Sequence, residues 1–496
     1  MYIFIKKQTL KHALQYGIYT ALIFLLLVGC APPDALIQFE ATAAPTPEAT
    51  STPYITRPKF DPGELVEYIA QTGDTISGLA GRFNTSAEEI LVNNPVIPHN
   101  VSVLPPGMPM QIPIYYLPLW GSQFQIIPDS AFVNGPAGIE FDIQSYVDAY
   151  PGWLKEHRDY AGGKNRSGAE IVSYVATNFS VSPRLLLAIL EYQSGALTKM
   201  EEPETPYTLG YIEPISHQGM YLQLIWAANT LNNGYYGWRG GSLTEFDRTD
   251  GSLERPDPWQ NAASVGIQYY FSRTLSGSRY ERAIGAEGLL ETYTNLFGDP
   301  WLDDRIHIPG SLEQPEMILP FPRARTWTYT GAPHTGWGEG FPFAALDFAP
   351  PTDFSGCFVA DPQQYTVAIA NGMVTRVDRG LAILDLDMDG DERTGWSILY
   401  LHIATPGRAK LGTILNSGDS IGYPSCEGGH TTGTHIHIAR KYNGEWILAD
   451  SSIPFEMEGW IPHNGSTAYA GTLSKNGIQI TASSVSGTNS QITSGD

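Results

Sequence analysis

The sequence contains little cysteine and few basic residues for its length. Three cysteines in 496 residues allow at most one intramolecular disulfide, which excludes a fold held together by a disulfide network. Lysine and arginine total 29 against 51 aspartates and glutamates, so the formal charge is −22. Because an acidic protein repels phosphate backbones, we expect no nucleic-acid partner. The apolar run Ala21–Val28 is too short to span a bilayer as a free helix.

Apolar and turn-forming residues, by contrast, are plentiful. Hydrophobic residues make up 42% of the chain and aromatic residues 11%, which is enough for packed cores. At about 150 residues per domain, the length predicts about three domains. Glycine (51 residues) and proline (37 residues) favour β-rich domains with many turns over long helical bundles.

The first thirty residues have the composition of an export signal rather than of a folded domain. Lys6, Lys7 and Lys11 precede the apolar run, which ends in Leu27-Val28-Gly29-Cys30. This ending resembles the lipobox of bacterial lipoproteins, which implies cleavage before Cys30 and attachment of lipid to its sulfur. The resemblance predicts an exported, extracytoplasmic protein that a lipid anchors to the membrane of the bacterial cell envelope. The alternative is an ordinary signal peptide (1–30) with an incidental cysteine.

Low-complexity segments flank the predicted domains. Residues 31–63 are rich in threonine, proline and alanine, a composition that cannot bury a core and predicts an extended tether. At ~3.1 Å per residue, this tether would reach on the order of 90 Å. Residues 466–496 are rich in serine, threonine, glycine and asparagine. Within them we predict a last strand at 472–482 and a disordered tail at 483–496.

Residues 64–115 have the pattern of a small α+β module. Val66–Ile69 and Met110–Pro113 alternate like strands, and the apolar residues that follow the first of them recur at helical spacing: Ile76, Leu79, Ala80 and Phe83. The unit resembles a LysM domain, whose Tyr-x-x-x-x-Gly-Asp-Thr pattern begins here at Tyr68. The resemblance implies binding to glycan that contains N-acetylglucosamine, most often peptidoglycan. A small module with another ligand is the alternative.

Residues 120–315 predict an α-helical domain. Helices are expected at 168–179, 183–193, 219–232 and 258–273. The run at 181–190 resembles the helix that carries the catalytic acid in lysozyme-like lytic transglycosylases, where a Glu-Ser pair closes the run. Here the pair is Gln193-Ser194, and an amide cannot protonate a glycosidic oxygen. Glu191 lies about 200° around the helix from Gln193 and cannot simply replace it. We predict a lysozyme-like, non-catalytic domain; an unrelated helical spacer is the alternative.

Residues 320–465 contain histidines and an aspartate in a pattern suited to metal chemistry. The strand-like segment around His435 and His437 directs both imidazoles to one face, ~6.6 Å apart. His402 ends another alternating segment. His334 and Asp347 flank a glycine-rich loop, so their side chains can converge although they lie thirteen positions apart.

This pattern resembles the lysostaphin-like zinc endopeptidases, the LytM and β-lytic group. The short His-x-x-x-Asp spacing common in that family is absent, because Phe343 stands where its histidine would be. The loop from His334 to Asp347 resembles the longer spacing of the β-lytic, LasA-type branch, and Cys426-Glu427-Gly428-Gly429 resembles the same branch. The resemblance implies an all-β domain with an antiparallel sheet.

The same resemblance implies a role for each residue of the group. His334, Asp347 and His437 would ligate Zn²⁺, and three ligands with one open position form a catalytic rather than a structural site. The catalytic pair, His402 and His435, would hold the developing oxyanion and move the proton to the leaving amine. The predicted activity is endopeptidase cleavage of peptide cross-links in peptidoglycan, targeted by the LysM module. The alternative is a non-catalytic peptidoglycan-binding or regulatory lipoprotein with a degenerate peptidase fold.

Two further features of this region carry predictions. If Cys30 is lipidated, Cys357 and Cys426 are the remaining thiols, and in an oxidising compartment they predict one disulfide. The alternating carboxylates of one short segment resemble the first half of a calcium loop: Asp385, Asp387, Asp389 and Asp391. The glutamate expected at the twelfth position is missing, since Trp396 is there. An acidic Asp-Gly hairpin turn explains the segment equally well, and both interpretations stay open.

Overall fold

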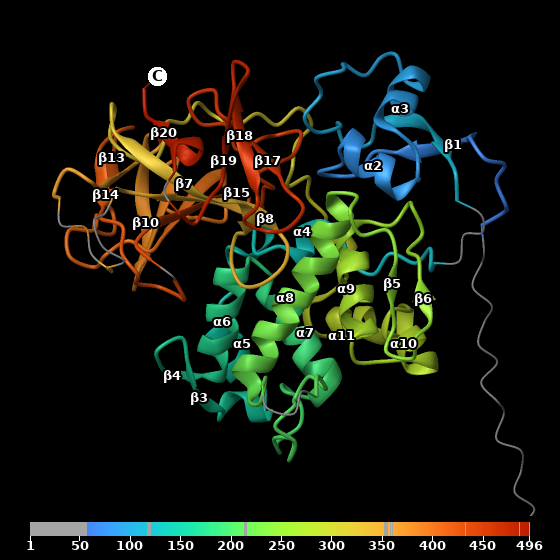
Figure 1. Ribbon diagram of the computed structural model, residues 1–496. Coiled ribbons are helices and arrows are strands. Elements are labelled where there is room, and N and C mark those ends of the chain that lie inside the picture. Colours follow the sequence, from blue (N-terminus) through green and yellow to red (C-terminus); the bar gives the residue numbers. More distant parts are fainter. Residues whose placement is uncertain are drawn as a thin grey trace, which may run out of the picture. The chain divides into compact units, whose positions relative to one another are not determined.

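The computed structural model describes residues 57–116, 121–212, 216–351, 356–357, 359, 361–431, 433–485 and 487–495 (Figure 1). The predicted signal peptide, Cys30 and most of the predicted tether lie outside these residues. Across the described residues, each helix is too short or too polar to cross a bilayer.

The N-terminal module has the predicted strand–helix–helix–strand order: β1 (Glu64–Ile69), α2 (Ile76–Arg82), α3 (Ala87–Asn93) and β2 (Pro109–Ile114). β1 and β2 pair antiparallel, with Tyr68 opposite Met110. Thr75 caps α2 through its side chain, and a Ser86–Glu89 capping box begins α3. The buried Asp74 accepts a hydrogen bond of 2.6 Å from the Tyr68 hydroxyl. These contacts explain why the Gly-Asp-Thr turn and the tyrosine occur together in the sequence.

The middle region is helical, as predicted. Its main helices are α6 (Gly168–Phe179), α7 (Pro183–Ser194), α8 (Met220–Arg239) and α9 (Ala262–Ser272). The shorter elements are α4 (Asp129–Phe132), α5 (Ile143–Asp148), α10 (Gly277–Ala283), α11 (Glu291–Phe297) and the hairpins β3 (Arg158–Ala161)–β4 (Lys164–Ser167) and β5 (Phe246–Asp247)–β6 (Leu253–Glu254). α7 has six consecutive fully buried positions, Leu185–Leu190, and therefore runs through the centre of this core (Figure 1).

The C-terminal region is built on one large antiparallel sheet, as predicted (Figure 1). Its strand order is β13-β10-β11-β12-β15-β8-β7-β20, with β16 also paired to β15. The bounds are β7 (Thr326–Thr335), β8 (Phe343–Ala349), β10 (Gly372–Asp378), β11 (Leu381–Asp385), β12 (Trp396–Leu401), β13 (Ile414–Leu415), β15 (Ile436–Tyr442), β16 (Glu445–Trp446) and β20 (Gln491–Thr493). Smaller sheets join β9 (Thr366–Val367) to β14 (Ser420–Gly422), and β17 (Ile461–Asn464) to β18 (Gly471–Lys475) and β19 (Ile478–Thr481).

The two faces of the large sheet bury different cores. Leu346 and Ile438 belong to the core of the C-terminal domain itself. Their neighbours Ala345 and Ala439 belong to the core of the helical domain. Because side chains alternate along a strand, one face of the sheet packs on the helices and the other packs on its own loops and small sheets.

The prediction of a disordered tail at 483–496 is wrong for its last residues. Residues 491–493 form β20, which pairs antiparallel with β7 at the edge of the large sheet, with Ile492 opposite Trp327. Ile492 is 1% exposed and belongs to the core of this domain. The polar composition of the segment concealed a single apolar residue that covers an otherwise unpaired edge strand. The predicted last strand is a hairpin of two, β18 and β19.

A buried charge network joins the three regions. Arg239, at the end of α8, lies 2.9 Å from Glu445 of β16 and 3.0 Å from Asp129 of α4. Arg239 also donates a hydrogen bond to the carbonyl oxygen of Thr72 in the N-terminal module. Nε2 of the buried His307 lies 2.6 Å from the Glu445 carboxylate. One guanidinium therefore contacts all three regions of the chain.

Candidate metal centre

Three neighbouring strands bring His334, Asp347 and His437 together. His334 lies near the end of β7, Asp347 in β8 and His437 in β15. Asp347 and His437 are directly opposite each other in the pairing of β8 with β15. β7 reaches them through irregular pairing, with register shifts between Tyr329 and Thr335. All three side chains are buried.

The three candidate ligand atoms form a nearly equilateral triangle. His334 Nε2 lies 3.0 Å from His437 Nδ1, and both nitrogens lie 3.2 Å from Asp347 Oδ1. Ligand atoms on a tetrahedral zinc ion, at about 2.0–2.1 Å from the metal, lie roughly 3.3 Å apart. The triangle therefore has the size of one face of a zinc coordination tetrahedron.

Hydrogen bonds to carbonyl groups orient both imidazoles. His334 Nδ1 donates to the Ala332 carbonyl oxygen at 2.8 Å, and His437 Nε2 donates to the Gly336 carbonyl oxygen at 3.1 Å. A carbonyl oxygen only accepts, so in the neutral rings the two nitrogens that face each other are both lone pairs. Two lone pairs and a carboxylate oxygen at these distances repel one another unless a cation lies between them. This is the arrangement in which histidine ligands are commonly fixed around a metal.

The surroundings lower the pKa values of Asp347 and His437. Burial raises the pKa of Asp347, but His334 and His437 outweigh it and hold the pKa well below its usual range. Burial also lowers the pKa of His437. Both effects favour the deprotonated forms that bind a metal.

His402 and His435 lie beside the triangle. Their ring centroids are 4.6 Å apart, and His435 Nε2 lies 3.9 Å from Asp347 Oδ2. His402 Nδ1 donates to the Glu427 carbonyl oxygen at 2.8 Å, and His435 Nδ1 donates to the Gly433 carbonyl oxygen at 2.9 Å. Burial, followed by the neighbouring histidines, lowers the pKa of His402 to about 3, which keeps the ring neutral. In the neutral rings both Nε2 atoms are therefore unprotonated and can accept a hydrogen bond.

His402 has a strained backbone. It directly follows β12 and has a φ of +69°, in the left-handed region that non-glycine residues rarely adopt. Such a conformation costs of order 1–3 kcal/mol and persists where the surroundings over-determine it. The Ser425 amide donates to the His402 carbonyl at 2.7 Å, and the His402 ring donates to the Glu427 carbonyl, so one short segment holds both the backbone and the side chain of His402.

The loop between His334 and Asp347 is held by the helical domain. The amide of Glu339 donates to Asn229 Oδ1 at 2.8 Å, and the amide of Phe341 donates to Asn233 Oδ1 at 2.7 Å. The two asparagines lie one turn apart on α8. Gly338 has a φ of +85°, and a Cβ there would lie 2.2 Å from Asn229 Oδ1. Because they lack a Cβ, the glycines of this loop leave room for the asparagine side chains of the helical domain.

Cys357 and Cys426 form a disulfide in the structure. Cys426 directly precedes Glu427, whose carbonyl oxygen orients His402. The Thr434 hydroxyl donates to the carbonyl oxygen of Gly356, the residue before Cys357. The disulfide therefore joins two segments that flank His402 and His435.

Three groups that sequence reasoning did not single out contact the centre. The ring of Tyr469 stacks on His334 with a centroid distance of 4.0 Å. Asn229 and Asn233 act on the ligand loop from the helical domain. None of them has a local pattern that distinguishes it from an ordinary surface residue, because the contacts join segments far apart in the sequence.

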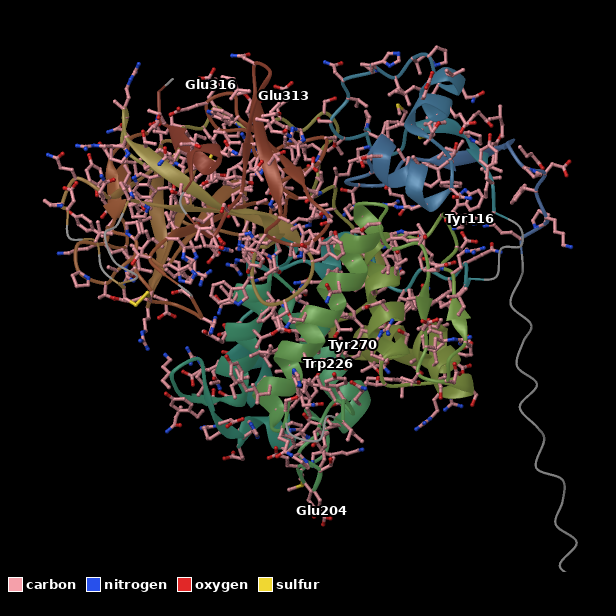
Figure 2. The ribbon with its side chains drawn as sticks, in the orientation of Figure 1. Tyr116, Glu204, Trp226, Tyr270, Glu313 and Glu316 are labelled. Atoms are coloured by element: carbon pink, nitrogen blue, oxygen red, sulfur yellow. A yellow bond between two sulfur atoms is a disulfide. The ribbon has the colours of Figure 1, made fainter. Side chains whose placement is uncertain are left out.

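Other candidate residues lie elsewhere. Gln193 Oε1 accepts a hydrogen bond from the buried Tyr270 hydroxyl, and Gln193 Nε2 donates to the Leu209 carbonyl. Tyr270 and its neighbour Trp226 are labelled in Figure 2. The carboxylate of Glu191 accepts from the Leu197 amide at 2.7 Å and so fixes the turn after α7. Of the remaining histidines, His430 is exposed and His463 contacts Ser474.

Comparisons with known proteins agree with this organisation. The family model described as "LasA, N-terminal domain" matches residues 125–311, and the LysM domain model matches residues 68–113. The chain is similar to protease LasA of Pseudomonas aeruginosa (22% identical over 358 residues, 68% of this chain and 77% of that protein) and to the beta-lytic metalloendopeptidase of Lysobacter enzymogenes (28% over 137 residues, 26% of this chain and 71% of that protein). Among solved structures, the deep-sea M23 metalloprotease pseudoalterin matches with a TM-score of 0.29 and 22% identity, over 34% of this chain and 96% of that chain.

The predicted combination of a LysM domain with a LasA- and LytM-like peptidase region is therefore confirmed. The middle region matches a different model from the one that sequence reasoning suggested, and its resemblance to lysozyme stays a prediction.

Proposed function

We propose that this chain is an exported zinc metalloendopeptidase that hydrolyses peptide cross-links of peptidoglycan. The observation that carries the proposal is the triangle of His334 Nε2, Asp347 Oδ1 and His437 Nδ1, with sides of 3.0–3.2 Å. The similarity of the chain to LasA and to the beta-lytic metalloendopeptidase supports peptidase activity. The LysM domain supports binding to the cell wall.

His334, Asp347 and His437 would hold the zinc ion. A zinc ion with an open coordination position supplies Lewis acidity toward a peptide carbonyl and a water nucleophile at neutral pH. Two imidazoles and one carboxylate suit zinc, and their orienting hydrogen bonds leave one lone pair of each ring directed at the others. No covalent intermediate with the protein is required.

His402 and His435 would move the proton. Because each donates through Nδ1 to a backbone carbonyl, each offers Nε2 as a base while its ring is neutral. Nε2 of one ring would take the proton that the attacking water loses and then pass it to the leaving amine. Once protonated, the same Nε2 becomes a donor that can stabilise the developing oxyanion. Each of these two histidines can therefore act first as a base and then, once protonated, as a hydrogen-bond donor. The tautomers favour this order, because Nε2 carries no proton at the start.

The LysM module would keep the catalytic domain near its substrate. Holding the enzyme on the glycan raises the local concentration of cross-links without any new contact at the zinc centre. A lipid on Cys30 would restrict the enzyme further, to the wall layer next to the membrane that bears the anchor.

Zinc content and hydrolysis, measured on the same preparations, test the proposal. Full-length protein should contain about one zinc per chain and should release free amino groups from peptidoglycan. His334→Ala should lower both zinc content and release at least about 100-fold, because a metal ligand is lost. His430→Ala, at an exposed histidine outside the triangle, should change neither. Zinc content and release that survive His334→Ala would overturn the proposal.

The same measurements separate the non-catalytic alternative. Protein that binds peptidoglycan and zinc but releases no amino groups would indicate a wall-binding lipoprotein with a degenerate peptidase fold. The complete ligand triangle favours the enzyme over this alternative.

A further inference from the structure

The segment between β11 and β12 gathers carboxylates away from the zinc centre. β11 ends at Asp385 and β12 begins at Trp396, so ten residues connect the two strands. Oxygen atoms of Asp385, Asp387 and Asp389 lie within 4.8 Å of one another. The pairing of β11 with β12 puts Asp385 opposite Ser397, at the other end of the strands from His402. This carboxylate loop is therefore a second group of possible metal ligands, separate from the first.

The loop is not a tight Asp-Gly hairpin turn. A two-residue turn would need no more than two residues between the strands, whereas this connection has ten. The chain folds back so closely that a Cβ on Gly395 would lie 2.2 Å from Asp387 Oδ2. Gly390 has a φ of +94°, and its amide donates to Asp385 Oδ2 at 2.9 Å. The backbone therefore wraps around the carboxylates.

The buried member of the group has an oxygen without a partner. Asp385 is 0% exposed, and its Oδ1 has no hydrogen-bond partner among the described residues. A buried, unpartnered carboxylate oxygen is costly, and two more carboxylates close by increase the cost. A bound cation would satisfy the free oxygen and offset much of the negative charge of the three side chains.

The other two carboxylates are accessible and already oriented. Asp387 and Asp389 are exposed, so a cation can reach them from solvent. Asp389 accepts hydrogen bonds from the Asp391 amide at 2.8 Å and from the Thr394 hydroxyl at 2.6 Å. Asp391 itself turns away and pairs with Arg393 at 2.6 Å. The ligand set is thus Asp385, Asp387 and Asp389, and the side chain of Asp391 is not part of it.

We propose that the carboxylate loop binds one calcium ion through Asp385, Asp387 and Asp389. Calcium takes six to eight oxygen ligands at about 2.3–2.6 Å, so two oxygens on one ion lie at most roughly 5 Å apart, which the group satisfies. Three carboxylates in an irregular loop suit calcium better than magnesium, which keeps several waters and demands octahedral geometry.

The ion would also order a contact between domains. Arg393 Nη1, in the same loop, donates to the Gly138 carbonyl oxygen of the helical domain at 3.2 Å. The amide of Gly395 donates to Asn443 Oδ1 at 2.8 Å, and Asn443 Nδ2 donates to the His307 carbonyl oxygen at 2.7 Å. Loss of the ion should therefore loosen the loop and its contact with the helical domain first.

Calorimetric titration of zinc-loaded full-length protein with CaCl2 tests the site. We expect one calcium per chain and no comparable heat with MgCl2. Asp387→Asn and Asp389→Asn are exposed, so both variants should fold, and each should weaken calcium binding at least about tenfold through loss of a charged ligand. Asp391→Asn removes the same charge from the same loop but no ligand, and its affinity should stay within about twofold of the parent.

Proteolysis provides a second measurement on the same proteins. Calcium should slow cleavage within 386–395 in the parent and in Asp391→Asn, but not in Asp387→Asn. The proposal fails if the parent gives no binding heat at 5 mM calcium, a concentration about five times the dissociation constant of the weakest extracellular sites. It also fails if Asp387→Asn and Asp389→Asn bind calcium as tightly as the parent.

Discussion

The backbone amide of Phe341 donates a hydrogen bond of 2.7 Å to Oδ1 of Asn233, a residue 108 positions earlier in the chain. The bond joins the loop between two candidate zinc ligands to a helix of another domain. Asn229 repeats the contact one helical turn away, at the amide of Glu339. The loop of the candidate metal centre is thus held by the helical domain.

Removing the two asparagines tests this dependence. We expect Asn229→Ala with Asn233→Ala to weaken zinc binding about 10- to 100-fold, the range seen when groups that orient metal ligands are lost. Competition with a chromogenic chelator measures the affinity. Asn93→Ala removes an asparagine side chain that donates to the Glu89 carbonyl in the LysM module, and it should leave zinc binding unchanged.

Glycine substitutions test the same contact from the other side. Gly338→Ala should destabilise the loop, since its Cβ would overlap Asn229, and it should lower zinc affinity. Gly418 has a similar φ of +91° with nothing within 4 Å, so Gly418→Ala carries the backbone strain alone. Equal zinc affinities in the two alanine variants would contradict the role of the contact.

The catalytic pair should affect turnover without affecting the metal. His402→Ala and His435→Ala are each expected to lower kcat about 10²- to 10⁴-fold, the usual contribution of a positioned acid–base group. Zinc content should remain at one per chain, because neither histidine belongs to the triangle. Steady-state release of amino groups and metal analysis check this together. A variant within threefold of the parent would remove that histidine from the proton pathway.

The disulfide should stabilise the domain and orient His402. Its cysteines are 69 residues apart, and a loop of this length corresponds to roughly 4 kcal/mol of unfolding free energy in the chain-entropy model. We expect the double variant Cys357→Ser, Cys426→Ser to unfold at a lower urea concentration. Its kcat should fall about tenfold, because Glu427 no longer holds His402 accurately. Dithiothreitol should reproduce the effect in the parent and do nothing to the variant.

Acid should destabilise the protein through Glu445. Burial raises the pKa of Glu445, but Arg239 and His307 outweigh it and lower the pKa to about 2. In the unfolded chain the pKa is near 4.3, so the unfolded state binds more protons between these values. Stability is therefore present above about pH 5 and is lost as the pH falls toward about 2, by about 3 kcal/mol.

Glu445→Gln should remove this part of the pH dependence and, by leaving Arg239 less well paired, lower stability at neutral pH by roughly 3 kcal/mol. Urea unfolding at pH 7 and pH 3 measures both effects, because most of the loss lies below pH 4. Glu316 is exposed and labelled in Figure 2, and Glu316→Gln is the matched control. If Glu445→Gln lost as much unfolding free energy between the two pH values as the parent, the charge network would not be the source of the pH dependence.

Sequence reasoning reached those parts of the site that follow from local periodicity. Alternation in strands is a property of neighbouring residues, so the shared face of His435 and His437 could be read directly. The helix at 183–194 was predictable for the same reason, since a buried run beginning at Pro183 has a local signature. The convergence of His334 with Asp347 rested on family resemblance, because β7 reaches that position only through irregular pairing.

The remaining parts depend on contacts between distant segments. Tyr469 stacks on His334 from a segment without a regular pattern, and Asn233 lies on a helix with many polar residues. β20 was missed because one isoleucine in a polar tail carries little signal until an edge strand is known to need a partner. In each of these cases, the position of the residue is determined by a residue far away in the sequence and not by those next to it in the chain.

The bond between Cys357 and Cys426 also bears on when the protein can act. Thiols stay reduced in the bacterial cytoplasm and oxidise after export. A newly made chain would therefore travel to the envelope with an imperfectly oriented His402 and would gain full competence only on arrival. Under the proposed function, the disulfide would therefore act as a maturation step that confines hydrolysis to the compartment outside the cytoplasm.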